Sequence, residues 1–300
     1  MLKIKSVMVT GASGKLGGPL CETLVAAGPQ AGVVLAGGTD LLGALRDHIH
    51  PDYPGLLVDL KRLPGLDHIA LVGGALEVGA LVSAAGLAAA PVVWQAAAAL
   101  AEAAGTLGSP PVRRLATIGG NVGRASPASD LLPALLVHEA RALIAGAAGI
   151  REAPVGDLLA GPGTTTLGRD EIITGLVVPP GPEGSGAAYR KLGRRSGGWD
   201  LALVGVAARL TLDASGRVAG ARLALASVGP TVLRCEEAEA CLVGRAPDDD
   251  GLAQAAAAAA AAARPVDDIR ASAAYRRVLT RVLTFRVLEV ARERARGAPR

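Results

Sequence analysis

The chain has 300 residues, which is long enough to bury a sizeable core and favours two domains. Half of the residues are hydrophobic but only 2% are aromatic, so few side chains could stack on bases, and nucleic acid is not an expected partner. The net charge of +4 is a small excess, and no apolar run approaches the roughly 18 residues that cross a membrane, so we expect a soluble cytoplasmic protein without a membrane span.

The first half alternates short apolar strands with alanine-rich helical stretches, a pattern typical of βαβ units. A strong helix is predicted from Val92 to Ala104, and another from Leu131 to Val137 with Pro133 in its first turn. The predicted strands are Ser6–Thr10, Gly32–Ala36, Leu56–Leu60 and Leu76–Val78.

The second half changes character after a Pro- and Gly-rich linker at residues 179–186. Apolar runs at Leu201–Asp213 and Arg217–Val228 predict an antiparallel hairpin, and the region from Glu236 to Arg294 predicts helices. Nine consecutive alanines, Ala255 to Ala263, favour helix without suggesting any particular contact. The fold class indicated is α+β.

Near the N-terminus, Val7 to Gly17 resembles the strand–turn–helix fingerprint of nicotinamide-dependent short-chain reductases. The Tyr-x-x-x-Lys pair typical of that family is missing, because Tyr53, Tyr189 and Tyr275 have no lysine four residues on. The better interpretation is a glycine-rich turn between a strand and a helix, and nicotinamide binding stays open as an alternative.

Two Gly-Gly loops, at Val34–Leu42 and Ala116–Asp130, each follow an apolar run and precede small hydroxyl or amide side chains. Glycine permits positive φ and a close approach of the backbone, so consecutive N–H groups can converge on an anion. Thr39, Thr117 and Asn121 are short donors beside these turns, suited to phosphate oxygens. The alternative for Thr39 and Asn121 is that they only stabilise their turns. The pair of loops predicts a phosphate-rich cofactor held between them.

No metal or nucleophile constellation accompanies the loops. Cys21, Cys235 and Cys241 form no C-x-x-C pair and are too few for an iron–sulfur cluster, which needs four ligands. The four histidines have no cysteine or acid at ligand spacing. A cofactor that supplies the chemistry itself fits this absence. Arginines crowd the last helical region and predict a solvated helix face or, alternatively, a surface for an acidic partner; they are Arg276, Arg277, Arg281, Arg286, Arg292, Arg294 and Arg296.

Four segments together resemble the FAD-binding (medium) subunit of the molybdenum hydroxylases, a family that includes subunits of xanthine dehydrogenase and aerobic carbon monoxide dehydrogenase. They are Ala36–Leu42, Thr117–Asn121 with Ala125–Asp130, Tyr189–Arg195 with Asp200, and Asp268–Arg277. The resemblance implies a two-subdomain, PCMH-type FAD-binding domain over residues 1–178, a linker at 179–186, and a carbon monoxide dehydrogenase flavoprotein C-terminal-like domain over 187–294. The family's usual opening is replaced here by Leu2–Gly28, so cofactor contacts before Val33 stay undefined.

By position, the resemblance implies sixteen cofactor-binding residues. The first loop would wrap the FAD pyrophosphate with Val34, Leu35, Ala36, Gly37, Gly38, Thr39, Asp40 and Leu41. The opposing cradle would comprise Thr117, Gly119, Gly120 and Asn121, with Leu107 and Ile173 as apolar contacts, Lys191 as a nearby basic group and Asp130 as an acceptor for FAD. The simpler alternatives are that Ser129 or Asp130 only caps the next helix, that Lys191 lies on an open surface strand, and that Leu107 and Ile173 are plain core.

The function implied is electron transfer through FAD. A large molybdenum-cofactor subunit would oxidise the substrate, and a small [2Fe–2S] subunit would deliver electrons to FAD on this chain. NAD, a quinone or oxygen would receive them, within a dimer of heterotrimers. The alternatives are a nicotinamide-dependent reductase that uses Gly11–Gly17 and a non-catalytic scaffold with the same fold.

Overall fold

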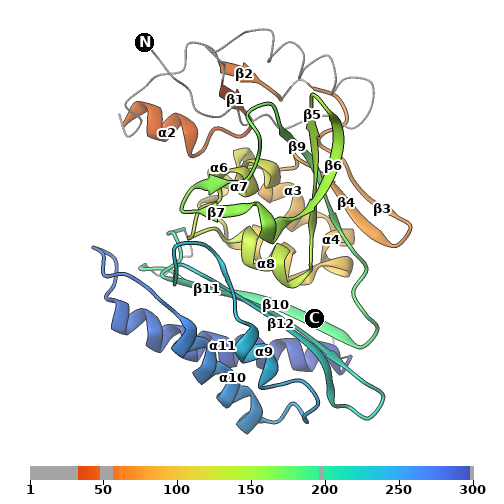
Figure 1. Cartoon of the computed structure of the whole chain (residues 1–300), viewed down its shortest axis with the longest axis vertical. Helices are drawn as coiled ribbons and strands as arrows, with labels where there is room; N and C mark the ends of the chain where they lie inside the picture. The colour runs from red at the N-terminus through yellow and green to blue at the C-terminus, as the bar shows by residue number, and fades with distance from the viewer. Residues whose placement is uncertain (1–32, 48–56, 62, 196–198, 298–300) are drawn as a thin grey trace.

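A computed structural model describes residues 33–47, 57–61, 63–195 and 199–297 (Figure 1). Its first unit is small: β1 (Val33–Leu35) pairs in parallel with β2 (Leu57–Asp59), and α2 (Leu41–Arg46) lies between them in sequence. Two of the predicted strands, at 32–36 and 56–60, are thereby confirmed. The predicted strand at 6–10 and the glycine motif at 7–17 lie outside the described residues.

The second unit contains a five-stranded sheet in the order β3-β4-β9-β5-β6. Every neighbouring pair in this sheet is antiparallel, so the prediction of βαβ units is wrong beyond β1 and β2. The chain reverses directly between β3 and β4 because Gly73 and Gly74 both adopt positive φ, as a tight hairpin requires. The strands are β3 (Ile69–Val72), β4 (Ala75–Gly79), β5 (Arg141–Gly146), β6 (Gly149–Pro154) and β9 (Ile172–Val178).

Six short helices lie between β4 and β5 in sequence, and all of them except α6 contribute buried residues to the first core. The helix predicted at 92–104 is two helices, because Ala97 leaves the helical conformation with φ −148° and ψ 63°. The break lets α4 contact β4 while α5 contacts β10 of the next domain. The helices are α3 (Ala84–Ala89), α4 (Pro91–Ala96), α5 (Ala98–Thr106), α6 (Pro110–Leu115), α7 (Ile118–Arg124) and α8 (Leu131–Val137). The short elements η1 (Val155–Leu158), β7 (Leu159–Gly161) and β8 (Thr164–Thr165) follow β6.

The C-terminal domain is an antiparallel sheet with helices on its outer face (Figure 1). The predicted hairpin is confirmed as β11 (Val204–Leu212) and β12 (Val218–Ala226), with β10 (Ser185–Leu192) and β13 (Leu233–Arg234) on either side. The helices are α9 (Glu236–Ala240), α10 (Asp249–Ala262) and α11 (Ala273–Ala295). The complete fold is therefore α+β, as expected.

Both faces of this sheet are buried, and alternate residues serve different cores. Ala187, Tyr189 and Ala207 face the helices of the first domain, whereas Ala188, Val206 and Ala208 face α10 and α11. Small side chains on the first face let α5 and α8 approach the sheet closely. The run of alanines from Ala255 to Ala263 does make particular packing contacts, because Ala255, Ala256 and Ala259 are fully or almost fully buried.

The end of α11 returns to the first domain. Arg294 donates to the Glu102 carboxylate of α5 at 2.6 Å and to the Ala187 carbonyl at 2.6 Å. The other Glu102 oxygen accepts the Tyr189 N–H at 2.7 Å. A side chain at Gly186 would lie 2.2 Å from the Ala291 carbonyl oxygen, so glycine is required where α11 crosses β10. These contacts fix β10 between the two domains.

Candidate functional site

The first Gly-Gly loop connects β1 to α2 and contacts the second loop directly. A Cβ on Gly37 would lie 2.0 Å from the Leu115 carbonyl oxygen, so only glycine allows the two backbones to meet there. Gly38 has φ +72°, and its carbonyl accepts the N–H of Leu42 at 3.0 Å. Ala36 in turn lies 3.8 Å from the position that a Cβ on Gly120 would occupy. The structure therefore brings the two predicted loops together.

The first loop carries four consecutive backbone N–H groups, from Gly37 to Asp40. Among the described residues, no acceptor is found for the N–H groups of Gly37, Gly38, Thr39 or Asp40. Gly37 and Gly38 are half-buried, while Thr39 and Asp40 are exposed. Consecutive unsatisfied N–H groups at a glycine turn form a concavity that suits an anion such as a phosphate. This observation fits a dinucleotide pyrophosphate.

The second Gly-Gly pair is not a loop, because Gly119 and Gly120 lie in the first turn of α7. The backbone donors of this turn are already used inside the protein. Ile118 and Gly119 donate to the carbonyls of Val82 and Ala80 at 3.0 and 2.9 Å, and Gly120 donates to the hydroxyl of Thr117, the N-cap of α7, at 3.2 Å. Glycine at 119 is needed for close packing, since a Cβ there would lie 2.6 Å from that of Ala80. What this turn offers a ligand is a surface of small residues and one side-chain amide.

That amide belongs to Asn121. Its carbonyl oxygen accepts the Ser129 hydroxyl at 2.5 Å, which leaves the NH₂ group without an acceptor among the described residues. The Ser129 oxygen also accepts the N–H of Leu132 at 3.1 Å. Ser129 is therefore the residue that caps α8, and Asp130 has no such role. We name residues 36–40 with 117–121 the glycine side of the site.

Asp130 and Lys191, far apart in sequence, form a buried ion pair. Their O–N distance is 2.8 Å, and their side chains are 5% and 3% exposed. The second Asp130 oxygen accepts the hydroxyl of Tyr189 at 2.6 Å. Lys191 therefore does not lie on an open surface strand.

Burial raises the pKa of the Asp130 carboxyl, although the charge of Lys191 and the two hydrogen bonds oppose that shift. Burial and the neighbouring Asp130 carboxylate raise the pKa of Tyr189 well above its usual range. A carboxylate, an ammonium and a phenol thus meet at the boundary of the two domains, and at neutral pH the phenol remains a hydrogen-bond donor.

The predicted apolar contacts lie in the first hydrophobic core. Leu107 follows α5 and is 8% exposed, and Ile173 in β9 is fully buried opposite Ile144. Their side chains pack as core residues, so any contact with a cofactor would come through the edge of Leu107 or through backbone atoms. Val34 is also buried, in β1.

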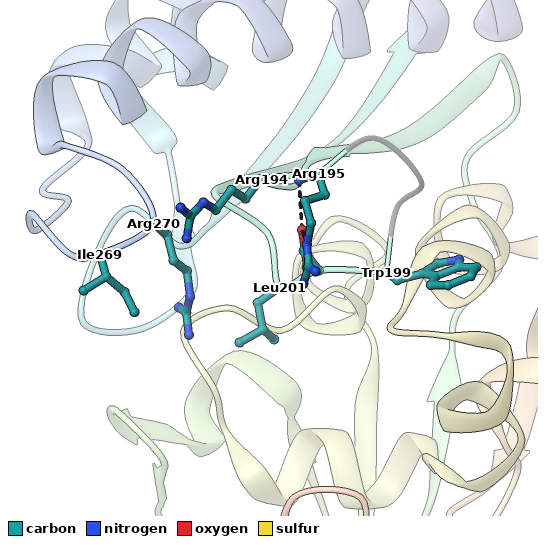
Figure 2. A pocket seen from close by; sticks show the side chains of 7 residues that line it. Arg194, Arg195, Trp199, Leu201, Ile269 and Arg270 are labelled. Carbon is teal, nitrogen blue, oxygen red and sulfur yellow. Dashed lines mark hydrogen bonds and ion pairs between the residues drawn. The ribbon is translucent and has the colours of Figure 1, made fainter.

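An open pocket of about 690 Å³ lies beside the buried ion pair. Figure 2 shows Ile269 and Arg270 at one end of the pocket and Trp199 at the other. Lys191 connects the pair to the pocket, because its ammonium donates to the Asp200 carbonyl at 3.1 Å. The lining residues are Arg194, Arg195, Trp199, Asp200, Leu201, Ile269 and Arg270. We name this pocket, with Asp130, Tyr189 and Lys191, the charged side of the site.

The charged side was predicted incompletely. The pocket residues fall within or between two segments that carry the family resemblance. Lys191 is the only residue of these two segments to which the sequence assigns a role in the site, and it does not line the pocket itself. A signal that could have identified them is that each segment has an arginine near an aspartate, Arg195 with Asp200 and Arg270 with Asp268. In the structure Arg195 and Asp200 form a two-pronged ion pair, with distances of 2.8 Å and 3.3 Å to the two carboxylate oxygens.

The arginine cluster of α11 is also more than a solvated face. Arg276 is 4% exposed, and Arg292 and Arg294 pair with Asp249 and Glu102. Within the described residues no group of His, Cys, Asp or Glu side chains could hold a metal ion. None of the described helices is long and apolar enough to cross a membrane.

Two family comparisons cover nearly the whole chain. Residues 20–181 match the FAD binding domain in molybdopterin dehydrogenase, and residues 187–291 match the CO dehydrogenase flavoprotein C-terminal domain. The 6-hydroxypseudooxynicotine dehydrogenase complex subunit alpha of Paenarthrobacter nicotinovorans is 34% identical over 273 residues, which cover 91% of each chain. The carbon monoxide dehydrogenase medium chain of Hydrogenophaga pseudoflava is 32% identical over 258 residues, 86% of this chain and 88% of that one.

Comparison with solved structures points to the same family. A carbon monoxide dehydrogenase chain from Hydrogenophaga pseudoflava superposes with a TM-score of 0.85 at 32% identity, covering 97% of this chain and 98% of that one. Quinoline 2-oxidoreductase from Pseudomonas putida 86 gives a TM-score of 0.85 at 28% identity, covering 98% and 99%. The chain therefore belongs to the FAD-binding medium subunits of the molybdopterin hydroxylases, the oxidoreductase family of carbon monoxide dehydrogenase and xanthine dehydrogenase.

Proposed function

We propose that this chain carries electrons from a small [2Fe–2S] subunit to a final acceptor, while a large molybdenum-cofactor subunit oxidises the substrate. FAD, when bound, supplies this chemistry, because a flavin can take up electrons singly and release them as a pair. The acceptor would be NAD, a quinone or oxygen. The complex would be a dimer of heterotrimers in the cytoplasm.

The observation that supports the proposal most directly is the set of donors on the glycine side. Four consecutive N–H groups, from Gly37 to Asp40, have no acceptor among the described residues, and they face a helical turn whose own donors are occupied. Charge-assisted hydrogen bonds from backbone N–H groups bind phosphate oxygens well. We assign the pyrophosphate of FAD to this loop, with the amide NH₂ of Asn121 as a further donor.

A chain of contacts leads from the glycine side to the charged side. Asn121 binds Ser129, the neighbour of Asp130, and Asp130 binds Lys191, which binds the Asp200 carbonyl at the pocket. FAD is an elongated molecule, and we propose that it extends from the glycine side along these residues with its ring end near Lys191. Asp130 and Tyr189 would then hold the ammonium of Lys191 in place beside the ring.

The pocket beside Lys191 would give the final acceptor access to the flavin. It is open, and its wall combines arginines with the exposed side chains of Trp199, Leu201 and Ile269. Because the substrate is oxidised on another chain, none of these residues is assigned to substrate selection.

The decisive experiment is a visible spectrum of the purified full chain, followed by denaturation and chromatography of the released cofactor. We expect paired flavin bands and about one FAD per chain. A colourless protein that binds NAD(P)H instead would contradict the proposal and favour a reductase that uses residues 7–17. A protein that binds neither dinucleotide would favour a scaffold.

The partners are tested separately, by purification through a tag on this chain from cells that also express a small [2Fe–2S] subunit and a large molybdenum-cofactor subunit of this family. Stoichiometric iron, acid-labile sulfide and molybdenum in the purified complex would support the electron route. Reduction of FAD by an added substrate of the complex, with no reduction when the iron–sulfur chain is omitted, would establish the direction of transfer. Purified complexes without iron would contradict it.

A further inference from the structure

A buried guanidinium beneath the pocket has no role in the function proposed above. Arg276 lies in the first turn of α11, and its side chain is 5% exposed. It donates to the carbonyls of Leu203 at 2.7 Å and Ser227 at 3.3 Å, and it pairs with the Asp268 carboxylate at 2.9 Å. One side chain therefore joins three separate segments.

The first of these segments forms one end of the pocket. The same Asp268 oxygen that binds Arg276 accepts the backbone N–H groups of Arg270 at 2.8 Å and Ala271 at 3.0 Å. Asp268 and Arg276 thereby fix the turn that presents Ile269 and Arg270 to the pocket. The Arg270 guanidinium itself lies 3.7 Å from the second Asp268 oxygen and remains 43% exposed.

The other two segments connect this turn to the part of the pocket lined by Leu201 and to the first domain. Leu203 is two residues from Leu201, which lines the pocket. Ser227 is held with φ +65°, donates its N–H to the Pro127 carbonyl at 2.8 Å, and donates its hydroxyl to the Ala202 carbonyl at 2.8 Å. Arg276 thus sets the position of Arg270 relative to both domains.

The position of Arg270 matters because the residues that line the pocket carry a net positive charge. Arg194, Arg195 and Arg270 line the pocket, while Asp200 is the one acid among its lining residues and pairs with Arg195. A cleft lined by one sign of charge raises the local concentration of oppositely charged reactants and their rate of encounter. An anion would therefore reach the pocket faster than a neutral molecule.

We infer that Arg276 is a positioning residue that holds Arg270 at the mouth of the pocket, where Arg270 draws anionic oxidants towards the flavin. The inference rests on the proposed function, because it takes the pocket to be the acceptor's route to the flavin. Arg270 is the group that meets the anion, and Arg276 acts only through the turn at residues 268–271.

The test uses the full chain loaded with FAD and reduced anaerobically by light and EDTA. Ferricyanide serves as the anionic oxidant and a ferrocenium salt as the cationic one, each mixed in a stopped-flow instrument at low salt. Oxidation of one fully reduced flavin converts two ferricyanide ions to ferrocyanide and releases two protons. The measured quantity is the ratio of the two second-order rate constants, which a general loosening of the fold would not change in a charge-selective way.

The variants are Arg270→Gln, Arg276→Lys, Asp268→Asn and the control Arg281→Gln, which removes an exposed arginine of α11 outside the pocket lining. We expect Arg270→Gln to lower the ferricyanide-to-ferrocenium ratio about fivefold. Arg276→Lys should lower it by a similar factor despite keeping the charge, because one ammonium cannot span the three acceptors. Arg281→Gln should change the ratio by less than about twofold, and the differences should shrink at about 1 M salt.

Each outcome decides one question. An unchanged ratio in Arg276→Lys, together with a reduced ratio in Arg270→Gln, would overturn the positioning role of Arg276. An unchanged ratio in Arg270→Gln would overturn the role of Arg270 and the inference with it. If Arg276→Lys does not fold, Asp268→Asn decides the question, because it removes the ion pair and keeps an acceptor for the backbone of residues 270 and 271. Loss of a negative charge beside Arg270 alone would raise the ratio, so a lowered ratio would support the positioning role and an equal or raised ratio would overturn it. Failure of the unmodified chain to bind FAD would instead contradict the proposed function.

Discussion

On the glycine side of the site the two loops meet backbone to backbone, and the feature that matters is the missing side chain at Gly37. On the charged side, Asp130 and Lys191 make their contacts through charged side chains that are largely withdrawn from water. The first arrangement depends on shape and should respond little to pH or salt. The second depends on charge compensation across a domain boundary and should respond to both.

The largest effect is expected on the charged side, from Lys191→Met. The substitution leaves the Asp130 carboxylate buried without its cation, which typically costs about 3–5 kcal/mol. Urea unfolding measures the loss. The double variant Lys191→Met with Asp130→Asn should recover part of it, and a single variant as stable as the original would refute the account of a compensated buried pair.

A matched control uses an ion pair that is open to water. Arg141 and Glu152 lie 2.7 Å apart with side chains 43% and 42% exposed. Arg141→Gln should change the free energy of unfolding by less than about 1 kcal/mol.

The glycine side is tested by Gly37→Ala. The new Cβ would lie 2.0 Å from the Leu115 carbonyl oxygen, so the loops must separate, at a cost of about 1–3 kcal/mol. We expect FAD content to fall more than stability does, measured by flavin absorbance per chain and by urea unfolding. Gly43→Ala is the control, because no atom lies within 4 Å of its Cβ position and alanine favours helix there. Equal FAD content in both variants would contradict the role given to the loop contact.

A smaller effect is expected where the two domains join, from Glu102→Gln. The amide keeps one acceptor for the Tyr189 N–H or for Arg294 but removes the charge that pairs with Arg294, so we expect a loss of about 1–3 kcal/mol. Thermal unfolding at two salt concentrations measures it. A loss that is the same for Glu102→Gln and Glu102→Ala would show that hydrogen bonding at this position contributes nothing.

The smallest effect is a dependence of stability on pH, from His138 at the end of α8. Its side chain is buried, and burial together with the positive charge of Arg209 lowers its pKa to about 3. The unfolded chain binds the proton below about pH 6.5 and the folded chain does not, so stability present above that pH is lost as the pH falls, by about 1.4 kcal/mol at pH 5.5.

His138→Phe should remove this part of the pH dependence, measured by urea unfolding between pH 7.5 and 5.5. His68→Gln is the control, since it removes an imidazole from the exposed surface. A slope unchanged by His138→Phe would assign the pH dependence to other groups.

The glycine side could be predicted from sequence because its determinants are local. A Gly-Gly pair after an apolar strand specifies a turn without reference to the rest of the chain, and the first loop follows β1 as predicted. The second pair was predicted wrongly as a loop, because Gly119 and Gly120 lie in the first turn of α7. The occupied donors of Ile118 and Gly119 could not be foreseen, since their acceptors at Val82 and Ala80 lie on a different segment.

The charged side could not be predicted in the same way, because its contacts join distant segments. The sequence does not distinguish Arg276 from its exposed neighbours Arg277 and Arg281. Arg276 is buried only because α11 packs on β10 and β11. The broken helix at Ala97 and the antiparallel central sheet have the same origin, because tertiary contacts override the local preference of an alanine-rich sequence.

The contact between Glu102 and Arg294 joins residues that are 192 positions apart. During synthesis the N-terminal part of the chain emerges first and can begin to fold, but Glu102 meets its partner only after Arg294 has been made. The two domains can therefore close fully on each other only after α11 has emerged. A nascent chain that lacks α11 would hold the glycine side of the site without the contact that joins α5 to the second domain.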